Sequence, residues 1–217
     1  MPRELPNLKI IITTCTKNKA VSPGFSSEQP GITPQEYLGN ASTINQLLQT
    51  RQAVLSKSNA RFGNPVGQQI SFEMYTSHGM LYDKLRADPI FEEILKNLNQ
   101  RGGHSKAHWF FLSGGYGLLH GAEIASAYQA VFDRGIARKE DIPFTVKDWI
   151  SLPQILDEMF NYLAPAHIYV VGSAAYVKFI QQTEAFQSSP SRFEISKGRA
   201  SSQECRQAVV DFAKNVF

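Results

Sequence analysis

Polar and reactive side chains follow an apolar run near the start of the chain, in TTCTKNKA (13–20). The hydroxyls of Thr14 and Thr16 can donate hydrogen bonds, and the ammonium groups of Lys17 and Lys19 can pair with an anion. The segment lacks the GxxxxGK spacing, followed by Ser or Thr, of a phosphate-binding P-loop. We therefore predict an anion-binding loop of another kind, with a solvated polar loop as the alternative.

Cys15 lies in the middle of this segment and is a candidate nucleophile, because neighbouring cations lower the pKa of a thiol. The alternative is that it is a small buried filler at the end of a strand. The second cysteine, Cys205, is far away, and the chain contains no CxxC or HExxH motif. We therefore expect no structural zinc, no disulfide framework and no bound cofactor.

A second segment, SGGYG (113–117), interrupts another apolar run. Gly114 and Gly115 permit positive φ and an unobstructed backbone, so their amides could face a phosphate, a carboxylate or a ribose. The segment is not in the GxGxxG register of a dinucleotide-binding turn. The alternative is a tight exit from a strand, with the ring of Tyr116 in the core and its hydroxyl bound to a polar partner.

A third apolar run ends in Gly172-Ser173 and enters a helix. Backbone amides and a hydroxyl at a helix N-terminus form a natural anion site, although Ser173 could equally be a plain N-cap. Near the end of the chain, Lys197 and Arg199 flank a glycine, where they either complete a basic rim or only occupy a turn.

Two carboxylates, Glu73 and Glu123, lie near the segments of interest in the sequence. Glu123 follows the glycine segment closely enough for acid–base chemistry, and a charge at a helix entry is the simpler alternative. The five histidines do not cluster at metal-ligand spacing; they are His78, His104, His108, His120 and His167. His78 and His120 lie close to the segments of interest, and we expect a surface or capping role for each.

The apolar runs and helical periodicities predict an α/β protein. Strands are expected over 8–15, 104–113, 167–173 and 191–201. Helices are expected over 34–58, 70–103 as one or two helices with a break at Asp88-Pro89, 146–165 with a bend at Pro153, 174–186 and 202–217 with Ser202 as the cap. The stretch between the glycine segment and residue 147 is expected to be irregular. This alternation indicates an open, mostly parallel, twisted sheet with helices on both faces, Rossmann-like but without a dinucleotide fingerprint.

Ligands bind such sheets at the carboxyl ends of the strands, near a topological switch point. The three polar segments follow three of the predicted strands, so we expect them to form one composite site.

The composition suits a globular protein of one α/β domain spanning 1–217. Hydrophobic residues make up 42% and charged residues 19% of the 217 residues. The net charge of +3 permits a phosphate-bearing partner without demonstrating one, and the absence of a long basic run excludes a polycationic tail. The N-terminal stretch reads as a strand rather than a signal peptide, and no window is apolar enough for a membrane helix. A cytoplasmic protein is expected.

Three segments occur in a characteristic order: IIITTCTKNKA (10–20), FEMYTSHGMLYDKL (72–85) and FLSGGYGLLHGAEIASAY (111–128). Their Thr/Ser-Cys-x-Lys-x-Lys loop, Met-Tyr-Thr-Ser helix and Tyr-Gly-Leu-Leu turn resemble the YaaA-like superfamily, which includes a peroxide-stress protein and short bacterial domains. The resemblance covers about half of the chain. Relative to the short domains, residues 21–71 look like an insertion made of a loop and a helix, and Gln129 stands where the family pattern leads us to expect an aspartate.

The resemblance implies protection from oxidative stress and DNA binding, and related domains accompany enzymes that modify nucleic-acid bases. The positions that match the family motifs are Cys15, Lys17, Lys19, Tyr75, Ser77, Ser113, Tyr116, Gly117 and Tyr128.

Three hypotheses follow. The first is a nucleotide- or nucleic-acid-binding protein, with DNA favoured over RNA, in which the lysines and glycine amides hold phosphate and Tyr75, Tyr116 and Tyr128 meet a base. The second is an enzyme that hydrolyses or transfers an N-glycosidic bond of nucleotides or bases, using Glu123 or Glu73 as acid–base and Cys15 or a hydroxyl as an assisting group. The third is a partner-binding module, which would expose an apolar face on the 34–58 helix.

Overall fold

The central strand of the protein is β1 (Lys9–Thr14), whose three consecutive isoleucines are fully buried. A continuous apolar run of this kind is typical of a strand covered by helices on both faces. The computed structural model describes residues 7–15, 31–59, 69–99 and 107–217. A predicted Gly-Gly helix stop at 102–103 therefore lies outside the described residues.

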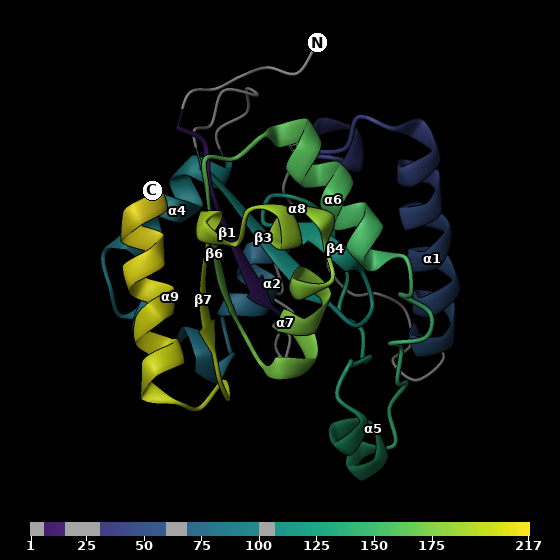
Figure 1. Ribbon diagram of the computed structural model, residues 1–217. Coiled ribbons are helices and arrows are strands. Elements are labelled where there is room, and N and C mark those ends of the chain that lie inside the picture. Colours follow the sequence, from purple (N-terminus) through teal and green to yellow (C-terminus); the bar gives the residue numbers. More distant parts are fainter. Residues whose placement is uncertain (1–6, 16–30, 60–68, 100–106) are drawn as a thin grey trace.

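The main sheet has five strands in the order β4-β3-β1-β6-β7 (Figure 1). All neighbouring pairs are parallel except β3–β4, which is an antiparallel hairpin. The strands beside β1 are β3 (Ala107–Ser113), β4 (Gly117–His120), β6 (His167–Gly172) and β7 (Phe193–Lys197). The predicted fold class, an open and mostly parallel sheet, is confirmed.

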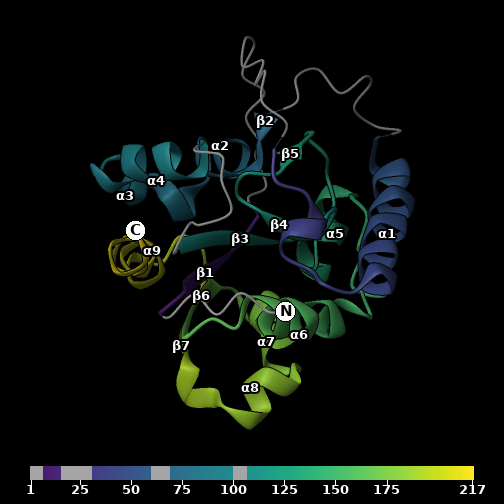
Figure 2. The same ribbon diagram turned by 90° about the horizontal axis from the view of Figure 1, so that it is seen from above.

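Helices cover both faces of this sheet (Figure 2). One layer contains η2 (Met80–Tyr82), α2 (Ser71–Thr76), α3 (Asp83–Arg86), α4 (Ile90–Asn99) and α9 (Gln203–Val216). The other contains α6 (Leu152–Leu163), α7 (Ala174–Gln181) and α8 (Glu184–Ser188), with η3 (Pro190–Arg192) leading into β7. None of the described helices has the length and apolarity needed to cross a membrane.

The remaining elements lie toward the β4 side of the sheet. The helix α1 packs against α6 and β4, and α5 projects from the body (Figure 1). These elements are η1 (Pro34–Glu36), α1 (Ala41–Asn59), α5 (Arg134–Glu140) and a two-stranded antiparallel sheet of β2 (Gln69–Ile70) and β5 (Ile124–Ala125).

Several element boundaries differ from the sequence prediction for local reasons. Pro153 occupies the first turn of α6 instead of bending a longer helix, which suits its missing N–H. The predicted 174–186 helix is two helices, because Thr183 accepts a hydrogen bond from the Phe186 amide and starts α8. The expected break at Asp88-Pro89 is confirmed, with the Asp88 carboxylate accepting from the Ile90 amide, and so is the Ser202 cap of α9.

The expectation of an irregular stretch from the glycine segment to residue 147 is wrong for the residues of β4, β5 and α5. SGGYG is the turn of the β3–β4 hairpin, and Ser113 lies opposite Gly117 across the pair. Leu118 and Leu119 are both fully buried, so β4 joins the sheet as a covered strand rather than a loop. Gly117 ends the turn with φ = 67°, a conformation that glycine adopts without strain.

Replacing Gly117 with alanine will destabilise the fold. The positive φ alone disfavours a residue with a Cβ by about 1–3 kcal/mol, and that Cβ would lie 2.3 Å from the Trp149 ring. We expect urea denaturation to show a free energy of unfolding lower by at least about 2 kcal/mol. The control is Gly135→Ala in α5, where the nearest atom is 3.2 Å away; a change there above about 1 kcal/mol would contradict this reasoning.

Candidate functional site

The carboxyl ends of β1, β3 and β6 meet at one place on the sheet edge. The Cys15 amide donates to the Leu112 carbonyl at 2.9 Å, and a Cβ on Gly172 would lie only 2.6 Å from the Thr14 methyl carbon. Within this sheet the chain runs from β1 to β3 on one side, and from β6 to β7 on the other. The β1–β6 boundary is therefore a topological switch point, the usual ligand position in open α/β sheets.

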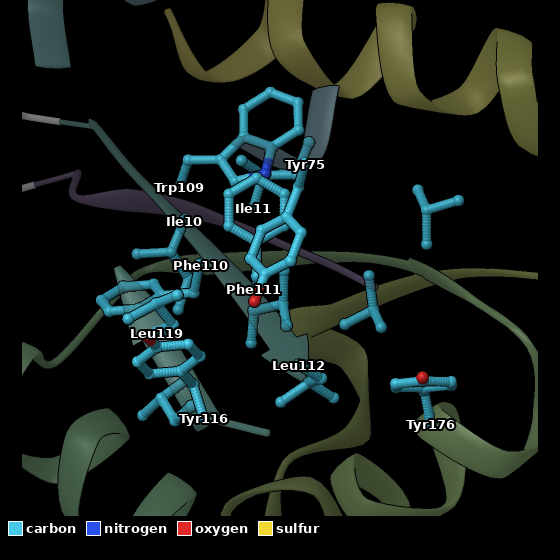
Figure 3. Close-up of a cluster of buried hydrophobic side chains, with 14 of the residues drawn as sticks. Ile10, Ile11, Tyr75, Trp109, Phe110, Phe111, Leu112, Tyr116, Leu119 and Tyr176 are labelled. Carbon is cyan, nitrogen blue, oxygen red and sulfur yellow. The ribbon is translucent and has the colours of Figure 1, made fainter. Parts of the chain in front are cut away.

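A buried cluster of hydroxyls, formed by Tyr75, Ser113 and Tyr128, lies at the end of β3. The Tyr75 hydroxyl donates to Ser113 Oγ at 3.1 Å and lies 2.9 Å from the Tyr128 hydroxyl, which also hydrogen-bonds to Ser113. Figure 3 shows Tyr75 among the aromatic side chains of β3. Burial raises the pKa of both tyrosines well above the usual value, so their hydroxyls stay protonated.

The glycine turn is held by this cluster. Ser113 Oγ accepts hydrogen bonds from the amides of Gly115 at 3.3 Å and Tyr116 at 3.0 Å. A Cβ on Gly114 would lie 2.4 Å from the Ala130 carbonyl oxygen, and one on Gly115 would lie 2.4 Å from the Tyr128 ring. The close approach that these glycines permit is thus made by the protein's own 128–130 segment.

Tyr116 lies in the core, as the alternative interpretation of the glycine segment as a tight strand exit predicts. Its ring is buried, and its hydroxyl accepts from the Ser126 amide at 2.9 Å. Tyr75 and Tyr128 are likewise enclosed, with 0% and 2% of their surface exposed. In the folded protein these rings therefore form the wall beneath the sheet edge, and a direct contact of any of them with a base stays a prediction.

Two tyrosines that sequence reasoning did not assign hold the end of β1. The Cys15 thiol lies 3.4 Å from the Tyr176 hydroxyl, and the Tyr82 hydroxyl donates to the Thr14 carbonyl. Tyr176 is in the first turn of α7, and burial raises its pKa well above the usual value. The segment VVGSAAY contained a signal for this position of Tyr176. A residue at the third position of a helix that directly follows a strand lies over the end of that strand.

Ser173 comes immediately before α7 in the extended conformation of an N-cap, but its side chain makes no capping hydrogen bond to the helix. Ser77, in contrast, ends α2, and its hydroxyl donates to the Glu73 carbonyl. The predicted ligands Thr16, Lys17 and Lys19 lie outside the described residues.

Glu123 forms a buried ion pair with Arg51 of α1. Its carboxylate lies 2.9 Å from the Arg51 guanidinium and accepts from the Tyr37 hydroxyl at 2.9 Å and the His120 amide at 2.8 Å. Arg51 also donates to the carbonyl of Tyr116, at 3.0 Å. These contacts give Glu123 a structural role between α1 and the hairpin, and its proposed acid–base role stays a prediction.

Glu73 lies two residues before Tyr75 on α2, and this spacing places the two side chains on nearly opposite sides of the helix. Partial burial raises the pKa of its carboxyl group, and the neighbouring Glu92 on α4 raises it further. Glu73 therefore faces α4, whereas Tyr75 faces the hydroxyl cluster.

Breaking the buried ion pair will destabilise the protein strongly. In Glu123→Gln the Arg51 charge loses its partner inside the fold, which typically lowers the free energy of unfolding by about 3–5 kcal/mol. The matched control is Asp148→Asn, which removes the more exposed pair with Lys57 and should change stability by less than about 1 kcal/mol. Equal effects of the two substitutions in urea denaturation would contradict the structural role of Glu123.

His108 and His120 form a pair on neighbouring strands, in which His120 is buried and His108 is partly buried. The burial of His120 differs from the surface or capping role expected for it. His108 Nδ1 lies 2.9 Å from His120 Nε2, and His120 Nδ1 accepts from the Ala122 amide. His120 Nε2 must then carry the proton and donate to His108. Burial lowers the pKa of His108 to about 4 and that of His120 well below its usual value.

This pair makes stability depend on pH. Below about pH 6.5 the unfolded chain binds protons that the folded protein excludes, so the free energy of unfolding falls as the pH is lowered toward 4. The slope is at most about 1.4 kcal/mol per pH unit for each histidine. Urea denaturation of His108→Gln should show a smaller decrease in the free energy of unfolding than the wild type shows over this pH range. The exposed His78→Gln control should not, and parallel profiles for wild type and His108→Gln would refute the assignment.

No protein-family model matches this chain, and no curated protein matches it.

Proposed function

We propose that this protein binds a nucleotide or a nucleic acid at the carboxyl edge of β1, β3 and β6. The observation that carries the proposal is the convergence of Thr14, Cys15, Gly172 and Ser173 at the switch point between β1 and β6. Sheets of this type bind their ligands at such a point.

The N-terminus of α7 supplies the first part of a phosphate site. Amide groups in the first turn of a helix carry partial positive charge. The Ser173 hydroxyl is not used as a cap, so it is available to donate to an anion beside these amides. Lys17 and Lys19 follow Cys15 by two and four residues in the sequence, and we assign them the balancing positive charge.

The enclosed tyrosines give this edge a fixed shape. Tyr75 and Tyr128 hold the β3 end through Ser113, and Tyr82 and Tyr176 hold the β1 end. A ligand that contacts Thr14, Cys15 and the α7 amides would meet a surface already ordered before it binds, which reduces the entropy lost on binding. A role in stress response or DNA protection belongs to the same proposal and rests on the sequence resemblance alone.

The glycosidic-bond alternative has one supporting observation, the position of the Cys15 thiol beside the Tyr176 hydroxyl at the sheet edge. Of its two candidate carboxylates, Glu123 is paired with Arg51, and Glu73 lies near Glu92 of α4. The partner-binding alternative expected an exposed apolar face on α1. There Ile44, Leu47 and Val54 are buried, and Leu48 is 40% exposed.

The proposal predicts that the protein binds nucleotides or mixed-sequence DNA with an affinity that falls steeply as salt rises, because phosphate contacts release counterions. Fluorescence anisotropy and calorimetric titration in low salt would measure it. Ser173→Ala and Lys17→Ala should each weaken binding several-fold, whereas the exposed controls Ser56→Ala on α1 and Lys96→Ala on α4 should not.

Salt-insensitive binding, or no binding in low salt, would refute the proposal. The same incubations, followed for release of free base from nucleoside monophosphates, test the enzyme alternative. Turnover that survived in both Glu123→Gln and Glu73→Gln would remove the two carboxylates from the chemistry.

A further inference from the structure

Residues 130–147 form an arm that projects from the carboxyl edge of the sheet and carries α5 (Figure 1). Its two ends are held together by a parallel bridge between Val131 and Phe144. A small apolar core of Val131, Ala137 and Ile142, with Phe144 packed against it, lies within the arm. The arm is therefore an ordered unit with its own packing.

The arm begins and ends on the candidate site. The Gly114 carbonyl accepts hydrogen bonds from Thr145 Oγ1 at 2.7 Å and from Trp149 Nε1 at 3.0 Å. At the other end, the Phe132 ring packs 5.0 Å from the ring of Tyr176, which contacts Cys15. α5 is thus fixed relative to the sheet edge by contacts with both the glycine turn and α7.

Exposed cations lie on α5. Arg134 and Arg138 are one turn apart on the same side of the helix, and Lys139 follows. Like charges at this spacing destabilise a helix by about 0.2–0.5 kcal/mol unless an anion lies between them. Within the described part of the chain these three side chains make no ion pair.

The arm also carries acidic residues, but the side of α5 that holds Arg134 and Arg138 stays basic. The Asp133 carboxylate caps α5 by accepting from the Ile136 amide at 3.0 Å. Glu140 belongs to the last turn of α5 together with Arg138 and Lys139, and Asp141 follows as the C-cap residue. The net charge of residues 133–141 is balanced, but the arginines share one face.

A second basic turn lies on the other side of the site, directly after β7. Lys197 and Arg199 are exposed there, and the amide of Gly198 between them donates to the Gly172 carbonyl at 3.1 Å. This turn is therefore attached to the end of β6, as the arm is attached to the end of β3. Cations consequently flank the switch point on both sides.

We propose that the α5 arm and the Lys197–Arg199 turn bind the phosphate backbone of one nucleic-acid strand on either side of the switch point. The inference rests on the proposed function and narrows it to a nucleic-acid strand, because successive phosphates of one strand can pair with cations on both flanks. Exposed arginines suit this task, since a guanidinium binds a phosphate through two parallel hydrogen bonds.

The test compares a single-stranded DNA oligonucleotide with a mononucleotide by fluorescence anisotropy and calorimetry. Arg134→Gln/Arg138→Gln and Lys197→Gln/Arg199→Gln each remove two positive charges, and glutamine preserves the helix propensity of α5. Each pair should weaken oligonucleotide binding about tenfold and reduce the slope of log K against log salt by about 1–2. Mononucleotide binding should stay unchanged. Arg138→Gln and Lys96→Gln, compared as single variants, form a matched pair for the loss of one exposed helical charge.

Oligonucleotide affinity and salt slope that match the wild type in both double variants, with circular dichroism showing intact folds, would overturn the inference and leave the proposed function standing. Equal affinities of the wild type for oligonucleotide and mononucleotide would also overturn it. Failure of the wild type to bind either ligand in low salt would instead refute the proposed function itself. Equal losses from Arg138→Gln and Lys96→Gln would show a general charge effect and would count against the arm.

Discussion

The hydroxyl oxygen of Ser113 is the acceptor on which the ligand-facing edge of this protein depends. It ends β3 and accepts from two amides of the hairpin turn and from the hydroxyl of Tyr75 on α2. Tyr128, which follows the hairpin, bonds to the same oxygen. One buried atom thereby connects a strand, a turn, a helix and the segment that leads into the arm. Because an unsatisfied buried donor is unfavourable by about 1–3 kcal/mol, these segments hold one arrangement.

The buried ion pair of Arg51 and Glu123 fixes the position of α1, as Ser113 fixes the hairpin turn. Apolar packing alone would leave the helix free to slide along the sheet, whereas the guanidinium must meet a carboxylate and the backbone carbonyls of Tyr116 and Leu118 in one geometry. The result is a rigid support behind the hairpin. The candidate site lies on the opposite side of this turn, where the strand ends and α7 converge.

Much of the fold follows from local sequence patterns, because β1, β3 and β6 are short β-branched or aromatic runs that can only be buried strands. The convergence of the polar strand ends can also be predicted from the sequence, since parallel strands place their carboxyl ends together. The hairpin was missed because Gly117 and the two leucines after it have no alternation that marks a strand. The roles of Arg51 and Tyr82 could not be inferred, because their partners are 72 and 68 residues away in the chain. Long-range pairings of this kind produce no periodic pattern in the sequence from which they could be predicted.

The separation of 72 residues between Arg51 and Glu123 has a kinetic consequence. Bringing the two groups together closes a long loop, and the entropy lost is recovered only when the hairpin and α1 are both in place. Interactions that form after the transition state for folding act mainly on the unfolding rate. If the ion pair belongs to that group, it slows the escape of α1 from the native state and has little influence on how fast the sheet assembles. Part of the lifetime of the folded state would then depend on a contact remote from the edge where we place the ligand.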